Sequence, residues 1–315
     1  RFNPQFDEMS GYRSETILAA PMRDQQRQII GVVQLINKRG GPFSMRDERL
    51  LSAMTSQAAI SIENANLYEE HLKQQLINRD LEMARTIQKS FLPQTIPQWD
   101  GWDVAAFWNP IREVAGDFYD FMPLPDGRMA VVIADVSGKG VPAALFMALS
   151  VTVLRFAIRM NLAVDALLGQ ANDVILSTQQ SRMFTTAIVA YIDLVSGEVE
   201  LASAGHNPPL VWRGDGVEFI EAEGVAMGLF GNVEFERARF TLNTGDVLVL
   251  YTDGITEVAN EAEEEFDEAH LEAVVSAHAR YSATEIAERI VDAALSFGGD
   301  KGVLDDQTLI VIRRL

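Results

Sequence analysis

Two short stretches, GDFYDF at residues 116–121 and ADVSGKG at residues 134–140, decide how this chain folds. In the first, Asp117 follows a glycine and precedes aromatic residues; in the second, Asp135 closes the apolar run MAVVIAD. Short apolar runs bounded by glycine and aspartate predict β-strands. Both carboxylates are therefore expected where a strand meets a loop.

The same placement recurs further along the chain. Asp253 closes DVLVLYTD, and Asp305 and Asp306 precede QTLIVI. Carboxylates that converge at one sheet edge repel one another and titrate upward unless cations neutralise them. Oxygen ligands without a Cys or His cluster favour Mg²⁺ or Mn²⁺ over Zn²⁺. Any single aspartate could instead be a turn or capping residue, but four similar placements favour a metal site.

The pattern around these residues predicts an α+β fold in which helices cover antiparallel sheets. Turn signals at Asp126-Gly127, Ser196-Gly197 and RGDG (213–216) indicate hairpins. The expected strands are Val104–Trp108, Phe118–Pro123, Met129–Val136, Thr185–Asp193, Val199–Ala204, Phe235–Leu242, Val247–Thr252 and Thr308–Arg313. The expected helices are Val141–Met160, Val164–Gln180, Asp267–His278 and Thr284–Phe297.

Composition narrows the class of protein. The 315 residues are 48% hydrophobic, contain no cysteine and carry a net charge of −19. Such a surface repels nucleic acid and anionic membranes, so neither is an expected partner. We found no apolar run of the roughly 18 residues that a membrane helix needs, and we expect a cytoplasmic protein. An acidic enzyme that acts on phosphate would need local positive charge, most simply bound metal.

A nucleotide-binding loop is a competing interpretation of SGKGVPA, which follows a strand and precedes a helix. The dinucleotide fingerprint requires an acidic residue about 20 positions later, where this chain has LRFAIRMN. A Walker loop requires Gly-Lys-Ser/Thr, whereas Lys139 is followed by Gly140. Both nucleotide interpretations are therefore disfavoured.

The chain divides into three predicted parts. Residues 1–57 contain two strands, TILAAPM and IIGVVQLINK, and the start of a helix that Ser44 could cap. Residues 58–92 continue that helix with an apolar stripe at Ile77, Leu81, Ala84, Ile87 and Phe91. A dimeric coiled coil explains this polar helix, and an amphipathic helix lying on its own domain is the alternative. Residues 99–315 form the large domain.

Five segments together resemble a known family: GDFYDF, ADVSGKGVPAALFMA, SAGHNPPLV, GDVLVLYTDGITEV and DDQTLIVI, in that order. They are similar to the bacterial metal-dependent serine/threonine phosphatases of the PPM (PP2C-like) class, in the sporulation and stress-response branch. The resemblance implies an α-β-β-α sandwich of antiparallel sheets. It also implies two Mn²⁺ or Mg²⁺ ions that activate a water for attack on phosphorus.

The resemblance assigns expected roles by motif. Asp135 resembles the aspartate that bridges both ions, with the Val136 carbonyl nearby. Asp253 and Asp305 resemble ligands, Asp306 is a neighbour of the site, and Asp117 belongs to the shell of the second ion. Asp135 and Asp253 are the expected catalytic pair.

Four further residues are weaker candidates for binding substrate phosphate. Ser137 and Lys139 could orient it, although a tight strand–helix turn also explains them, and Arg112 could grip it. His206, in SAGHNPP, is expected to hold a turn rather than to act in catalysis. The chain lacks the Asp-Gly-His-Gly-Gly pattern of eukaryotic members, so the resemblance leaves the phosphate grip open.

The N-terminal part resembles the closing portion of a GAF sensor domain, through GYRSETILAAPM, IIGVVQLINK and SQAAISIENANLYEE. It also carries Asn37-Lys38, Phe43 and Asp47-Glu48, which are similar to a pattern of cyclic-nucleotide-binding GAF domains. That pattern mainly implies a structural Lys–Asp pair, so nucleotide binding here is the weaker expectation.

These resemblances together predict a protein phosphatase that a sensor controls through the linker helix, as a homodimer. The implied substrate is a phosphorylated anti-sigma-factor antagonist of the STAS type. One alternative is a dimeric signalling adaptor with a catalytically silent phosphatase fold. Another is a sensor that binds only a small molecule.

Overall fold

The structure is a computed structural model that describes residues 11, 13–178, 182–214 and 216–315. The chain separates into two compact units, Arg1–Asp80 and Leu81–Leu315. The predicted end of a helix at Gln180 and the Asp215 position of the RGDG turn lie outside the described residues.

The first unit has little core of its own. Strands β1 (Ile17–Arg23) and β2 (Ile29–Ile36) form an antiparallel pair, and helix α2 (Met45–Phe91) follows. Ser44 caps that helix: its Oγ lies 3.4 Å from Asp47 N, and Asp47 Oδ2 accepts from Ser44 N at 2.6 Å. The expected Lys–Asp pair is present, with Lys38 Nζ 2.5 Å from Asp47 Oδ2. Ile29 and Val32 remain more than half exposed, as expected for two strands and one helix.

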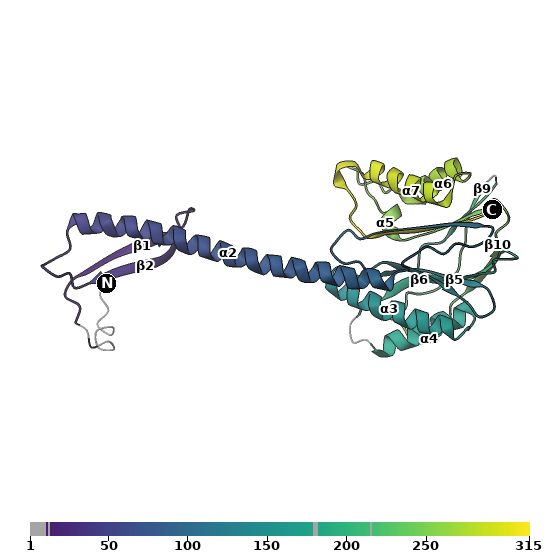
Figure 1. Cartoon of the computed structure of the whole chain (residues 1–315), viewed down its shortest axis with the longest axis horizontal. Helices are drawn as coiled ribbons and strands as arrows, with labels where there is room; N and C mark the ends of the chain where they lie inside the picture. Colours follow the sequence, from purple (N-terminus) through teal and green to yellow (C-terminus); the bar gives the residue numbers. More distant parts are fainter. Residues whose placement is uncertain (1–10, 12, 179–181, 215) are drawn as a thin grey trace. The chain divides into compact units, whose positions relative to one another are not determined.

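The second unit is built on two five-stranded antiparallel sheets (Figure 1). The first has the order β10-β7-β6-β5-β4 and the second the order β3-β12-β11-β8-β9. The strands are β3 (Trp102–Asn109), β4 (Phe118–Pro123), β5 (Met129–Val136), β6 (Thr185–Ile192), β7 (Glu198–Ala204), β8 (Leu210–Arg213), β9 (Gly216–Phe219), β10 (Arg237–Thr241), β11 (Val247–Tyr251) and β12 (Gln307–Arg314).

Helices cover the outer face of each sheet, which confirms the predicted α+β sandwich (Figure 1). α3 (Val141–Arg159) and α4 (Val164–Thr178) pack on the first sheet. α6 (Asp267–His278) and α7 (Ala283–Gly298) pack on the second, beside the short α5 (Asp253–Thr256) and the 3₁₀ turn η1 (Gly299–Lys301). The sequence predicted the turn of the hairpin β8–β9 but not its strands, because four residues are too few to show an alternation of apolar and polar side chains.

The central strands are buried on both faces, which is why they are continuous apolar runs. In β11, Leu248 and Leu250 pack in the cluster that includes the first sheet, whereas Val247, Val249 and Tyr251 pack with α6 and α7. Each fully buried aliphatic side chain contributes roughly 1.5–3 kcal/mol. These layers make a rigid frame whose loops can be held in fixed positions.

By length and composition, α3 is apolar enough to cross a membrane, although polar residues and Arg155 interrupt its apolar sequence. Its inner residues Phe146, Met147, Val151 and Leu154 are buried in the sheet-facing core. Core helices of this kind pass the same test of hydropathy as membrane helices.

Candidate active site at one end of the sandwich

Strand register brings the first two aspartates together. Phe118 pairs with Ala134 in the β4–β5 ladder, so Asp117 and Asp135 lie opposite each other at the same end of the first sheet. β11 ends and β12 begins at the matching end of the second sheet, because Tyr251 pairs with Leu309. The structure therefore gathers the predicted acidic residues at one end of the sandwich.

Two glycines permit this close approach. A Cβ on Gly116 would lie 2.8 Å from the Val136 carbonyl oxygen and 3.4 Å from Asp135 Oδ1. A Cβ on Gly254 would lie 1.9 Å from the carbonyl oxygen of Asp306. Any side chain at either position would push the loops apart, so glycine next to each aspartate is a steric requirement.

Asp117 is almost completely buried and is held by two hydroxyl groups. Thr252 Oγ1 and Thr308 Oγ1 each donate to Asp117 Oδ2 at 2.7 Å. Burial raises the pKa of Asp117 well above its usual value, and the charges of Asp135 and Asp306 raise it further. Neither threonine was predicted from the sequence, although Thr252 adjoins Asp253 in YTDG and Thr308 lies two residues after Asp306 in DDQT.

Asp135 lies close to the end of β5, and its pKa is raised to about 6. Burial is the main cause, and the charges of Asp253, Asp305 and Asp306 add to it. The next residue, Val136, directs its carbonyl oxygen toward Gly116, at the same place. Carboxylates this close favour either protonation or a bound cation.

The sequence suggested that Asp253 closes a strand, but the structure places it after the strand has ended. β11 ends at Tyr251, and Asp253 is the first residue of α5. Burial raises its pKa, as do the charges of Asp305 and Asp306, while Lys139 opposes the rise. Asp253 nevertheless belongs to the cluster.

Asp306 binds the loop that leads to Asp117. Its Oδ1 accepts from Ile111 N at 2.9 Å and its Oδ2 from Gly116 N at 2.8 Å. Burial raises the pKa of Asp306, while these two backbone donors lower it. The geometry gives Asp306 a positioning role between the two sheets.

Asp305 is paired with a cation. Lys139 Nζ lies 2.6 Å from Asp305 Oδ2 and also donates to the Leu304 carbonyl at 2.9 Å. Ser137 is likewise engaged: its Oγ accepts from Phe184 N and its N donates to Phe184 O, both at 2.9 Å. Neither side chain is directed freely toward a substrate.

His206 lies behind Asp135. Its Nδ1 is 2.8 Å from Thr186 Oγ1, and Thr186 is the partner of Asp135 in the β5–β6 ladder. Burial lowers the pKa of His206 to about 4, so the ring is neutral at pH 7. This geometry fits the expected turn residue better than a proton donor.

Arg112 lies apart from these contacts, on the exposed loop before Asp117. With Arg85, Ile111 and Glu113 it lines a shallow hollow of about 500 Å³. The structure does not bring Arg112 into hydrogen-bond contact with any of the described acidic residues.

Gln88 of α2 was also missed. It is buried, and its amide exchanges two hydrogen bonds with the backbone of Ala115, in the loop that Asp306 binds. Gln88 lies on the same helix face as Ala84 and Phe91 of the apolar stripe, and a polar residue at that position could have indicated a buried hydrogen bond. The last turns of α2 thus lie on their own domain, whereas Ile77 and Ile87 remain more than half exposed.

The donor set suits the expected ions. Buried, mutually repelling carboxylates and one backbone carbonyl are the ligands that Mg²⁺ and Mn²⁺ prefer. Within the described ranges, no three carboxylate or imidazole groups already have the spacing of a formed metal site. Asp305 is paired with Lys139, and Asp306 accepts hydrogen bonds from backbone N–H groups.

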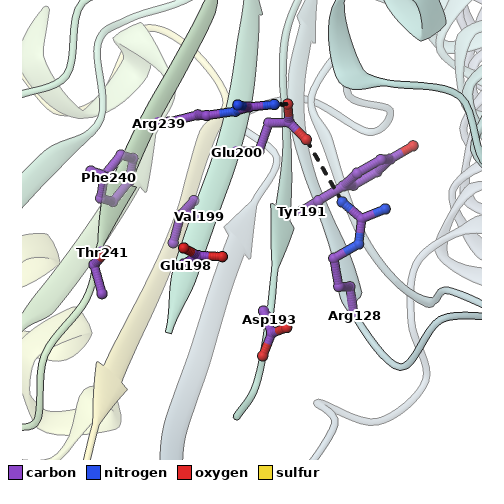
Figure 2. A pocket seen from close by; sticks show the side chains of 9 residues that line it. All are labelled: Arg128, Tyr191, Asp193, Glu198, Val199, Glu200, Arg239, Phe240 and Thr241. Atoms are coloured by element: carbon purple, nitrogen blue, oxygen red, sulfur yellow. Dashed lines mark hydrogen bonds and ion pairs between the residues drawn. The ribbon is translucent and has the colours of Figure 1, made fainter. Parts of the chain in front are cut away.

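Another hollow, of about 420 Å³, lies at the opposite ends of the strands (Figure 2). Figure 2 shows Glu200 between Arg239 and Arg128, with Tyr191 beside Arg128. Glu200 Oε1 accepts from Arg239 Nη2 at 2.8 Å, and Glu200 Oε2 lies 3.7 Å from Arg128 Nη1. Thr186, the partner of Asp135, lies at the start of β6, whereas Asp193 in this hollow follows the other end of the same strand. The hollow is therefore remote from the acidic cluster.

Comparisons with known proteins agree with this geometry. The family model Stage II sporulation protein E (SpoIIE) matches residues 125–315, and the GAF domain model matches residues 1–62. Phosphoserine phosphatase RsbU of Bacillus subtilis is 30% identical over 253 residues, which are 78% of this chain and 75% of RsbU.

Two solved structures share the fold. The SiaA-PP2C domain of Pseudomonas aeruginosa is 24% identical with a TM-score of 0.69, and the match covers 76% of this chain and 98% of that domain. The RsbU and RsbW domains of Rv1364c from Mycobacterium tuberculosis are 28% identical with a TM-score of 0.58, over 68% of this chain and 60% of that one. The chain therefore belongs to the SpoIIE family of PP2C-type serine/threonine phosphatases.

Proposed function

We propose that this protein is a metal-dependent phosphatase that removes phosphate from phosphoserine or phosphothreonine in a partner protein. The observation that carries the proposal is the gathering of Asp117, Asp135, Asp253 and Asp305 at one end of the sandwich, with the pKa of Asp135 raised to about 6. Such repulsion is costly in a site without a cationic ligand.

The chain's own residues have separate tasks in this proposal. Asp135, Asp253 and Asp305, with the Val136 carbonyl and the more deeply buried Asp117, would hold two Mn²⁺ or Mg²⁺ ions. The ions would supply positive charge for the phosphoryl oxygens and acidify a water. Thr252 and Thr308 fix Asp117, and Asp306 holds the adjacent loop through Ile111 N and Gly116 N.

The proposed substrate is a phosphorylated STAS-domain anti-sigma-factor antagonist. The resemblance to the stress-response branch supports it, as does the similarity to RsbU, which is named a phosphoserine phosphatase. The net charge of −19 argues against nucleic acid or an anionic membrane as a partner. The cytoplasmic location remains a prediction.

The contacts of α2 support control through this helix. Gln88 binds the loop before Asp117, and Arg155 of α3 links the end of α2 to β4. Arg155 Nη2 donates to Phe91 O, and Arg155 Nε donates to Asp120 Oδ2, each at 2.5 Å. A movement of α2 would therefore reach both the site loop and α3.

A homodimer through α2 is part of the proposal. Leu76, Ile77, Met83 and Ile87 are each more than half exposed, and a second helix would cover such residues. The acidic cluster does not depend on the partner helix for any of its contacts described above.

The test is hydrolysis of p-nitrophenyl phosphate with Mn²⁺, Mg²⁺ or EDTA, followed by a phosphorylated STAS protein. We expect metal-dependent turnover that EDTA abolishes and that Asp135→Asn reduces at least about 100-fold. Asp193→Asn, which removes the charge of a partly exposed carboxylate just beyond the opposite end of β6, is the matched control and should retain activity.

Binding of Mn²⁺ without turnover on either substrate would favour the adaptor alternative. Turnover that EDTA leaves unchanged would contradict the metal-dependent mechanism.

A further inference from the structure

The pair between Lys139 and Asp305 joins two loops that the sequence separates widely. Lys139 belongs to the turn between β5 and α3, and Asp305 to the segment before β12. The ammonium contacts two successive residues of that segment, Asp305 Oδ2 at 2.6 Å and Leu304 O at 2.9 Å. The contact is therefore a bridge between the turn that follows Asp135 and the segment that carries Asp305.

The turn that carries Lys139 is held in place. Ser137 exchanges two hydrogen bonds with Phe184, the residue immediately before β6. Gly138 and Gly140 have positive φ angles of 87° and 78°, which favour glycine. Lys139 thus extends from a fixed base, and its side chain is the movable part of the bridge.

The charge of Lys139 acts on members of the cluster besides Asp305. Its charge opposes the burial-driven rise in pKa at both Asp253 and Asp306. Asp117 is held by hydroxyl groups and Asp306 by backbone amides. Asp305 is the member of the cluster that is held by the end of a flexible, charged side chain.

We propose that Lys139 is an internal cation that occupies Asp305 in the metal-free protein and leaves it when a divalent ion binds there. The inference rests on the proposed function, because the ion and the ammonium compete for the same Asp305 oxygen. Both side chains are about 40% exposed, and pairs of this exposure are weak. The bridge therefore reduces repulsion in the metal-free cluster but yields readily to an ion of higher charge.

Calorimetric titration with Mn²⁺ tests the competition on the full chain. Lys139→Met should bind Mn²⁺ roughly two- to fivefold more tightly than wild type, the factor that corresponds to a weak exposed pair. Lys139→Arg, which keeps the charge, should resemble wild type. Lys301→Met removes a lysine charge paired with Glu263 instead, and it should leave the affinity unchanged. Unchanged or weaker binding by Lys139→Met would overturn the proposal.

Amine labelling read by mass spectrometry measures the release of Lys139 directly. With saturating Mn²⁺, Lys139 should react several-fold faster than in EDTA, whereas Lys301 should react at the same rate in both. If calorimetry shows bound Mn²⁺ but Lys139 labelling does not accelerate, Lys139 stays on Asp305 and only this inference fails. If wild type binds no Mn²⁺, both the inference and the proposed metal dependence fail.

Discussion

Gln88 and Ala115 exchange two hydrogen bonds across 27 residues of sequence: Gln88 Nε2 donates to Ala115 O at 2.5 Å, and Ala115 N donates to Gln88 Oε1 at 2.9 Å. The next residue, Gly116, donates its N–H to Asp306. The last turns of α2 and the acidic cluster therefore share one loop.

Gln88→Ala should destabilise the protein and alter activity. It leaves two buried backbone groups of Ala115 without their partner, which costs about 1–3 kcal/mol. Gln94→Ala is the control, because the exposed Gln94 makes two longer bonds of 3.2 Å, to Lys89 O and Leu92 O, just beyond the end of the same helix. Urea unfolding and Mn²⁺-dependent turnover measure the two effects. Equal behaviour of both variants would contradict the coupling.

Asp117→Asn should stabilise the metal-free protein at pH 8 by about 1–3 kcal/mol while removing the stabilisation that Mn²⁺ provides. The raised pKa means that the charged carboxylate is unfavourable in the folded state, so this cost appears as pH rises through that pKa. The gain of the variant should therefore shrink at lower pH. Thermal unfolding in EDTA and in Mn²⁺ is the measurement.

Asp120→Asn supplies the contrasting control for this prediction. Asp120 is also buried but is paired with Arg155 at 2.5 Å, so its substitution should destabilise the protein. A loss of stability in both variants would show that Asp117 is not under repulsion.

His206→Asn should weaken the dependence of the free energy of unfolding on pH below neutrality. Burial lowers the pKa of His206 to about 4 from 6.5, so the unfolded chain binds its proton more readily than the folded one. The contribution of neutral His206 is complete above pH 6.5 and is lost as pH falls toward 4. Over that window wild type should lose about 1–3 kcal/mol more than the variant.

Denaturant unfolding at several pH values gives the comparison for His206. His71→Asn, on an exposed stretch of α2, is the control for the same chemical substitution away from the core. Parallel profiles for wild type and His206→Asn would mean that His206 is protonated equally in both states.

Gly254→Ala should destabilise the protein by about 3 kcal/mol or more, because overpacking against backbone cannot relax easily. The added Cβ would lie 1.9 Å from Asp306 O. Gly169→Ala, within α4 and with open space around its Cβ position, should instead stabilise by about 0.5–1 kcal/mol. Unfolding midpoints measure both, and tolerance of Gly254→Ala would contradict the close approach of these loops.

A double substitution, Leu76→Glu with Met83→Glu, should dissociate the proposed dimer. Both side chains are more than half exposed on α2, and charge in a helix–helix seam disfavours pairing. Sedimentation should show monomers for the double variant and dimers for wild type and for Gln75→Glu, a substitution at an exposed polar position. A wild-type monomer at all concentrations would contradict the α2 dimer.

Much of the fold could be predicted from the sequence, because its apolar runs are long and turn residues mark where they end. The runs MAVVIAD and DVLVLYTD predicted central strands, and the structure buries both faces of β5 and β11. β8 and β9 were missed as strands because four residues carry no measurable period. Asp253 was expected where a strand meets a loop, and the short helix α5 that it begins was not predicted, because a single turn carries no helical period.

The sequence by itself determined that several aspartates lie at the ends of apolar strands. Strand ends are local features, which neighbouring glycines mark in the sequence. Only the tertiary structure decided their partners. Gly116 N binds Asp306 across 190 residues, and Lys139 Nζ binds Leu304 O across 165. Such contacts depend on how two sheets stack and how their loops meet, and no local period encodes that. The result is that Thr252, Thr308 and Gln88 join the site by packing, whereas Asp117 and Asp135 enter it through strand register.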